Sequence, residues 1–284
     1  MQSLHWLSSD SGSLWKLLAG LQALLSIWLV QATQHNPSLT LLAVIVWGGA
    51  IVCIEDHLEQ LELRPSHSSL VAGLFLLLLA TVRSCLVLDK ESLVLILPLL
   101  QGIGLALLLR PIRQLAGWRQ PLIVLSLFPL QDLAIRLLPD FWLSVVTAKL
   151  SQAFLLVFGV NAASSGRNVL LGERGVAIMG ACNSVDLIAQ LTAIAVVFAL
   201  AFPIRSRTWR IGFIATAPLL AIVVNAGRIA LLAVLNSSDL GYGKTLFTFL
   251  HDEWGALIFS GIATLIMGQI YLVLIDRELR GLHG

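Results

Sequence analysis

The sequence predicts an all-α polytopic membrane protein, and three bulk properties support that fold class. Residues of the AVILMFWYC group make up 57% of the 284 positions, and charged residues make up only 12%. The charged share is about half of the ~25% found in soluble domains. The mean hydropathy is +0.89. These values exclude an ordinary water-soluble enzyme, and the net charge of +2 gives no reason to expect a nucleic-acid partner.

Apolar runs place the transmembrane helices, because a helix needs about 20 predominantly apolar residues to cross a bilayer. About eight such runs occur, and the loops between them are short. We therefore expect a single integral membrane domain over residues 1–284. In chain order the runs are Leu14–Gln31, Leu39–Ile54, Ser69–Leu88, Ser92–Leu109, Pro121–Leu138, Asn183–Phe202, Ile211–Leu235 and Trp254–Ile275.

The segment between the fifth and sixth runs has a different character. Phe141–Val160 is apolar but is interrupted by polar residues such as Ser144, Thr147 and Ser151, which favours a helix lying in the outer interface. Asn161–Ala181 follows, with two short β-prone stretches that predict a small external β-hairpin. If Phe141–Val160 crosses the bilayer instead, the topology beyond it inverts.

Lys and Arg residues of the loops are divided unequally between the two sides, which predicts the orientation. We expect the richer side to be cytoplasmic, with both termini on it, in the plasma (inner) membrane. That side carries Lys16, Arg64, Arg110, Arg113, Arg119, Arg205, Arg207, Arg210, Arg277 and Arg280. The other carries Lys90, Lys149, Arg167, Arg174 and Lys244.

Ionisable residues within apolar runs are costly in a membrane and mark candidate sites. Arg228 lies seven residues before Leu235, the outward end of its run, or roughly 10 Å into the membrane. Asn225 precedes it by three residues and shares its helix face. Arg228 is either a buried partner of Asp186 or Asp132, or a cation aimed at developing negative charge.

Two further reactive residues stand at outer ends of apolar runs. Cys182 precedes the sixth run in polar surroundings, and His251 precedes the eighth. With Arg228 they supply a thiol, an imidazole and a guanidinium from three helices, which are the parts of a thiol acyl-transfer site. No second His or Cys stands nearby at ligand spacing, so neither a metal nor another cofactor is expected.

The order and spacing of these motifs carry a family resemblance. Cys182, the Asn225–Arg228 motif and His251 with Gly255 follow one another within about Pro129 to Ile275, the motif-bearing region 129–275. In this order the chain resembles the exosortase/archaeosortase family, and most closely its cyanobacterial branch, cyanoexosortase. Many family members have Cys-Ser-Gly at the nucleophile, whereas this chain has Cys182, Asn183 and Ser184.

The resemblance implies a membrane cysteine protease or transpeptidase whose partners are membrane-anchored exported proteins with a C-terminal Pro-Glu-Pro-type sorting signal. It implies that Cys182 forms a thioester on the outer face of the membrane. His251 would transfer protons, and Arg228 would stabilise the oxyanion or hold the substrate. We expect Asn225, Asp186 and Asp252 to bind the substrate or to support these three residues.

Two other functions remain open on the residues alone. A transporter or channel could line a polar pathway with Arg228 and Asp186, and it would tolerate replacement of Cys182 by Ala. In a non-catalytic membrane assembly protein, the same polar residues would hold helices together.

Overall fold

The computed structural model describes residues 7–58, 65–86, 92–179, 182, 184–238 and 241–283. The chain divides into two compact units. Unit 1 is Met1–Asp132 with Leu200–Phe202, and unit 2 is Leu133–Ala199 with Pro203–Gly284. Two compact units can lie within one membrane domain, so the single domain over residues 1–284 stays a prediction.

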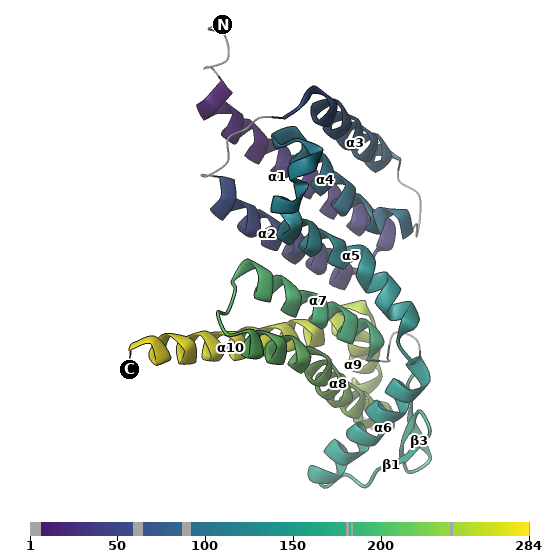
Figure 1. Cartoon of the computed structure of the whole chain (residues 1–284). Helices are drawn as coiled ribbons and strands as arrows, with labels where there is room; N and C mark the ends of the chain where they lie inside the picture. Colours follow the sequence, from purple (N-terminus) through teal and green to yellow (C-terminus); the bar gives the residue numbers. More distant parts are fainter. Residues whose placement is uncertain are drawn as a thin grey trace, which may run out of the picture. The chain divides into compact units, whose positions relative to one another are not determined.

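Unit 1 is a group of helices packed against one another (Figure 1). α3 and α4 approach closely at two glycines, where a Cβ on Gly73 would lie 2.8 Å from the carbonyl oxygen of Gly104. Small residues permit such contacts between membrane helices. The elements are α1 (Leu7–Gln34), α2 (Pro37–Leu58), α3 (His67–Cys85), η1 (Ser92–Leu95), α4 (Leu97–Leu109), η2 (Ile112–Trp118) and most of α5 (Arg119–Leu137).

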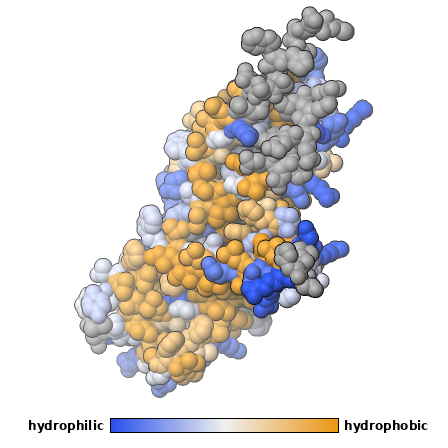
Figure 2. Space-filling view, turned by 90° about the vertical axis from the view of Figure 1, so that its left-hand side faces the viewer, coloured by the Kyte–Doolittle hydropathy of each residue, from blue (hydrophilic) through white to orange (hydrophobic). Residues whose placement is uncertain are grey.

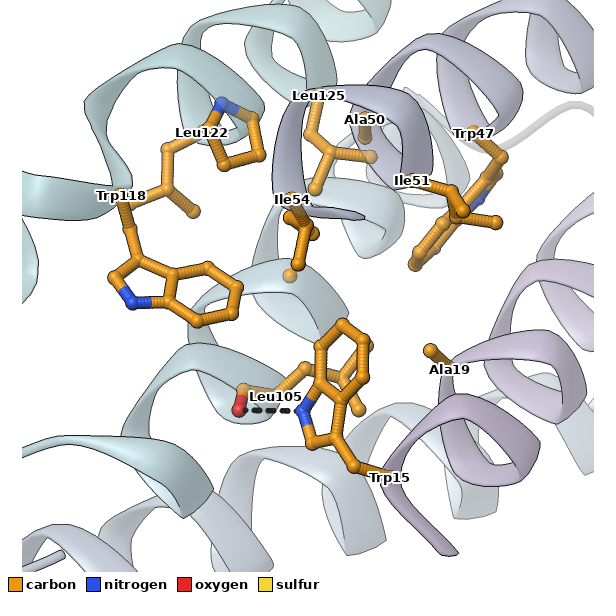
Figure 3. Close-up of a pocket in the computed structure, with 12 residues that line it drawn as sticks. Trp15, Ala19, Trp47, Ala50, Ile51, Ile54, Leu105, Trp118, Leu122 and Leu125 are labelled. Atoms are coloured by element: carbon orange, nitrogen blue, oxygen red, sulfur yellow. Dashed lines mark hydrogen bonds between the residues drawn. The ribbon is translucent and has the colours of Figure 1, made fainter. Parts of the chain in front are cut away.

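Three tryptophans, Trp15, Trp47 and Trp118, converge on an apolar pocket within unit 1 (Figure 3). Trp15 Nε1 donates a 3.2 Å hydrogen bond to the carbonyl oxygen of Leu105. The rings of Trp15 and Trp118 meet edge to face with centroids 5.9 Å apart. The other lining residues are aliphatic or glycine, among them Ile54, so this pocket contributes packing and hydrophobic surface rather than a nucleophile.

The helices confirm a multi-pass membrane protein. In the described part of the chain, seven helices are long and apolar enough to cross a membrane, and two apolar helices are shorter, Leu93–Leu109 and Val185–Ala201. The shorter pair covers the fourth and sixth predicted runs, so the total of eight stays a prediction. The seven are Leu14–Gln34, Pro37–Ile54, His67–Cys85, Arg113–Leu137, Asp140–Val157, Arg207–Ser237 and Glu253–Arg280. Large apolar side chains are exposed in both units, and Figure 2 shows a broad apolar surface.

Helix α6 (Asp140–Val157) turns its polar side chains inward and its apolar side chains outward. Ser144, Thr147 and Ser151 are fully buried, whereas Phe141 and Trp142 are exposed. Burial against the protein therefore accounts for the polar residues that favoured an interfacial helix. Since α6 also has the length and composition of a membrane span, its interfacial position and the sidedness derived from it stay predictions.

A small antiparallel sheet follows α6 and consists of three strands rather than the one predicted hairpin. Its order is β1-β2-β3. Val169 and Val176, paired across β2 and β3, are buried in a core that includes residues of α6 and α8. Asn236 Nδ2 also donates to the carbonyl oxygen of Gly175 at 2.8 Å. The strands are β1 (Ala163–Ser165), β2 (Asn168–Leu171) and β3 (Arg174–Ala177).

The remaining helices of unit 2 build a second core. Ala217 and Ala221 of α8 pack in one buried cluster with Ala263 of α10. The Glu278 carboxylate of α10 accepts the backbone N–H groups of Arg205 and Ser206, at 3.1 and 2.9 Å, at the start of α8. The helices are α7 (Val185–Ala201), α8 (Arg207–Ser237), α9 (Gly243–His251) and α10 (Glu253–His283).

Candidate active site

Cys182 lies in the turn between β3 and α7, inside unit 2. Its side chain is 3% exposed and belongs to a buried cluster that also contains Ile229, Leu232 and Leu250. Its backbone N–H donates to the carbonyl oxygen of Met179 at 3.2 Å. The thiol therefore lies in a cluster with buried side chains of α8 and α9.

Asn225, in the middle of α8, is hydrogen-bonded to the turn that carries Cys182. Its buried side-chain Nδ2 donates to the carbonyl oxygen of Cys182 at 3.0 Å and to Ser184 Oγ at 3.1 Å. A carbonyl oxygen can only accept. The side-chain nitrogen of Asn225 must therefore face Cys182, so these partners determine the orientation of the amide.

Arg228, one turn after Asn225 on α8, joins this helix to the end of α9. Its buried guanidinium donates from Nε to the carbonyl oxygen of Leu250 at 3.2 Å and from Nη2 to that of His251 at 2.8 Å. The last carbonyl groups of a helix have no partner within it, so Arg228 supplies one. Asp186 is exposed in the first turn of α7. The two hydrogen bonds of Arg228 go to backbone carbonyls, whereas the sequence left Asp186 or Asp132 open as a buried partner.

His251 is the last residue of α9, and its side chain is 44% exposed. The imidazole stacks on Phe247, one turn earlier, with ring centroids 5.5 Å apart and an interplanar angle of 18°. Its Nδ1 lies 4.0 Å from Oδ1 of the exposed Asp252, which is beyond hydrogen-bond distance. The structure therefore links His251 to Arg228 through its backbone carbonyl, while its imidazole borders solvent.

Arg228 of α8 is the residue that relates the three predicted residues to one another. Cys182 is buried near the Arg228 guanidinium, and Arg228 holds the helix end that bears His251. Among the residues that the structure describes, no group of three or more His, Cys, Asp or Glu side chains is placed to hold a metal ion.

The model of the transmembrane exosortase family (Exosortase_EpsH) matches residues 28–268. The chain belongs to the transmembrane exosortase family. Family membership implies a membrane cysteine peptidase or transpeptidase whose substrates are membrane proteins with sorting signals. Comparisons with curated proteins and with solved structures gave no match.

The sequence did not predict a contact between two polar residues of this exosortase, Thr147 and Ser184. Thr147 Oγ1 lies 2.7 Å from Ser184 Oγ, and both side chains are fully buried. Ser144, Thr147 and Ser151 stand three and four residues apart, so they share one helix face. That spacing in an apolar helix was the available signal for a buried polar contact.

The environment of Cys182 in this exosortase predicts the pH dependence of its reactivity. Burial raises the pKa of the Cys182 thiol, and the positive charge of Arg228 lowers it to a smaller degree. Only the thiolate reacts with alkylating reagents. In a variant that retains Cys182 as its one cysteine, we expect the rate of alkylation to rise with pH to a midpoint above the ~8.5 of an ordinary cysteine. A cysteine peptide in the same buffer is the control, and a midpoint below that of the peptide contradicts the prediction.

Gly255, in the first turn of α10, touches the carbonyl group that Arg228 binds. A Cβ at this position would lie 2.2 Å from the carbonyl oxygen of Leu250. We expect Gly255→Ala to displace that carbonyl and to destabilise the exosortase by about 1–3 kcal/mol, as overpacked sites do. Gly261→Ala, on the same helix with no atom within 4 Å of its Cβ, is the control. Thermal unfolding in detergent measures both, and equal stability of the two variants contradicts the prediction.

Proposed function

We propose that this exosortase is a transpeptidase that cleaves a C-terminal Pro-Glu-Pro-type sorting signal and transfers the exported protein to an acceptor. The reaction takes place on the outer face of the plasma (inner) membrane. The chain belongs to the cyanobacterial branch of the family. One observation carries the proposal: a buried thiol lies within electrostatic range of a buried guanidinium that also holds the helix end bearing an imidazole.

Cys182 is the nucleophile. Because burial raises its pKa, its thiol proton must be removed as the sulfur attacks. Sγ adds to the scissile carbonyl carbon near the signal, and the thiol proton passes to His251. The tetrahedral intermediate then collapses to a thioester, and His251 returns the proton to the departing amine. An acceptor nucleophile attacks the thioester in turn and releases the Cys182 thiol.

Arg228 stabilises the oxyanion of the tetrahedral intermediate. A guanidinium carries five N–H groups, and Arg228 uses two of them on the carbonyls of Leu250 and His251. The remaining N–H groups keep their fixed positions, since the two bonds hold the plane of the guanidinium. Preorganised donors of this kind act on charge that develops in the reaction.

Three further residues support the nucleophile, the imidazole and the guanidinium. Asn225 fixes the peptide of Cys182 through the carbonyl oxygen. Asp252, whose Oδ1 is 4.0 Å from His251 Nδ1, orients the imidazole once it is protonated. Asp186, exposed in the first turn of α7, supplies negative charge on the helix that follows Cys182.

The test is processing of a tagged exported protein in cells with and without the exosortase. Two substrates are compared, one with the intact signal and one in which Pro-Glu-Pro is replaced by Ala-Ala-Ala. We expect a shortened product only from the intact signal and only when the exosortase is present. Added hydroxylamine should divert the thioester to a hydroxamate, which mass spectrometry detects at the new C-terminus. A product that is independent of the exosortase overturns the proposal.

A further inference from the structure

A chain of hydrogen bonds runs from the Cys182 peptide to the buried face of α6. Asn225 Nδ2 donates to the carbonyl oxygen of Cys182 and to Ser184 Oγ. Ser184 Oγ lies 2.7 Å from Thr147 Oγ1, and Thr147 Oγ1 lies 2.8 Å from the carbonyl oxygen of Leu143. All three polar side chains are buried, so water does not compete for these bonds.

The direction of each bond follows from the number of protons available. The carbonyl oxygen of Leu143 can only accept, so the single hydroxyl proton of Thr147 points to it. Thr147 Oγ1 must then accept the proton of Ser184. Ser184 Oγ in turn accepts an N–H of Asn225, whose second N–H goes to the carbonyl oxygen of Cys182. Both N–H groups of Asn225 are thus engaged, which leaves none for an oxyanion.

We propose that Thr147 and Ser184 are positioning residues for Cys182, and that α6 is the support on which the nucleophile turn is fixed. The hydroxyl of Thr147 orients Ser184, Ser184 orients the amide of Asn225, and this amide fixes the Cys182 peptide. A second bond joins the same face of α6 to α8, since Ser151 Oγ donates to the carbonyl oxygen of Ala226 at 2.9 Å. The catalytic consequence rests on the proposed function.

Thr147→Val tests the proposal, because it keeps the shape of the side chain and removes the hydroxyl. Ser184 then loses its acceptor, and the turn that carries Cys182 is held less firmly. We expect processing of the tagged substrate to fall by roughly 10–100-fold, as it does when a reacting group is misplaced by about 1 Å. Ser184→Ala should act in the same way, and Thr147→Ser should retain most of the activity.

A matched control separates this effect from the loss of any buried threonine. Thr33 of α1 is also 0% exposed, and its Oγ1 also donates at 2.8 Å to the carbonyl oxygen four residues earlier. Thr33→Val therefore removes the same intrahelical bond in unit 1. We expect it to leave processing unchanged, and a loss equal to that of Thr147→Val overturns the proposal.

Thiol alkylation supplies a readout that does not depend on the enzyme reaction. In a Cys85→Ser background, Cys182 of unit 2 and Cys53 of unit 1 are the two remaining thiols, and both are buried. We expect Thr147→Val to increase alkylation of Cys182 severalfold and to leave Cys53 unchanged, because the loosening is local. Equal increases at both thiols, or none at Cys182, overturn the positioning role. Faster Cys182 alkylation in a chain that processes no sorting substrate supports the positioning role and contradicts the proposed function instead.

Discussion

The Cys182→Ala variant is expected to lose processing of the sorting substrate entirely. Removing the nucleophile of a covalent mechanism lowers the rate by roughly 10⁶-fold in a well-studied protease, which places the residual reaction below detection. Cys182 packs in a buried cluster, and Ala is smaller and apolar, so the variant should still fold and insert. The measurement is the yield of shortened substrate, with insertion of each variant confirmed in isolated membranes.

The other two cysteines provide matched controls for this result. Cys85→Ser changes an exposed thiol of unit 1, and Cys53→Ala changes a buried one. Both should process the substrate at the wild-type rate. Normal processing by Cys182→Ala would return the question to transport, where Arg228 and Asp186 would be the next residues to replace.

Arg228→Lys should also slow processing strongly, although it keeps the positive charge. The planar guanidinium of Arg228 bonds the carbonyls of Leu250 and His251 and keeps further N–H groups available for an oxyanion. A lysine ammonium lacks this planar arrangement of donors. Leaving a buried acceptor unpaired costs about 1–3 kcal/mol, and loss of one oxyanion donor slows turnover by roughly 10²–10³-fold. We therefore expect reduced thermal stability together with a loss of processing.

Arg210→Lys on the same helix is the control for this substitution. Arg210 also donates twice to a backbone carbonyl, from Nε and Nη2 to that of Ile204, at 3.2 and 2.6 Å. It lies at the opposite end of α8 from the Cys182 turn, so its replacement should affect stability and spare processing. If Arg228→Lys retains normal processing, the oxyanion role of Arg228 is wrong.

The sequence located the long helices well because the membrane fixes their length. The predicted runs Ile211–Leu235 and Trp254–Ile275 fall within α8 (Arg207–Ser237) and α10 (Glu253–His283). Helix α9 escaped prediction because its nine residues, Gly243–His251, are too few to give an apolar run of membrane length. Strand β1 (Ala163–Ser165) was not predicted for a related reason, since three residues are too few to show the alternation of apolar and polar side chains that indicates a strand.

The candidate reactive residues are easier to select from the sequence than the bonds that hold them. Arg228 stands out because a cation within an apolar run is unusual, and Cys182 and His251 stand out because each lies at the end of an apolar run. The sequence left a carboxylate partner open for Arg228, but its hydrogen bonds go to carbonyl groups of α9. Every residue has a carbonyl group, so such a partner leaves no trace in the sequence, and only the packed structure identifies it.

The unequal exposure of the thiol and the imidazole bears on the fate of an acylated enzyme. Cys182 is 3% exposed, whereas the His251 side chain is 44% exposed. An acyl group on Cys182 would therefore be shielded from bulk water, while the imidazole of His251 could still exchange protons with solvent. Exclusion of water suppresses hydrolysis of reactive intermediates. The lifetime of the acyl-enzyme would then be set by the arrival of the acceptor, and the partition ratio would favour transfer over hydrolysis.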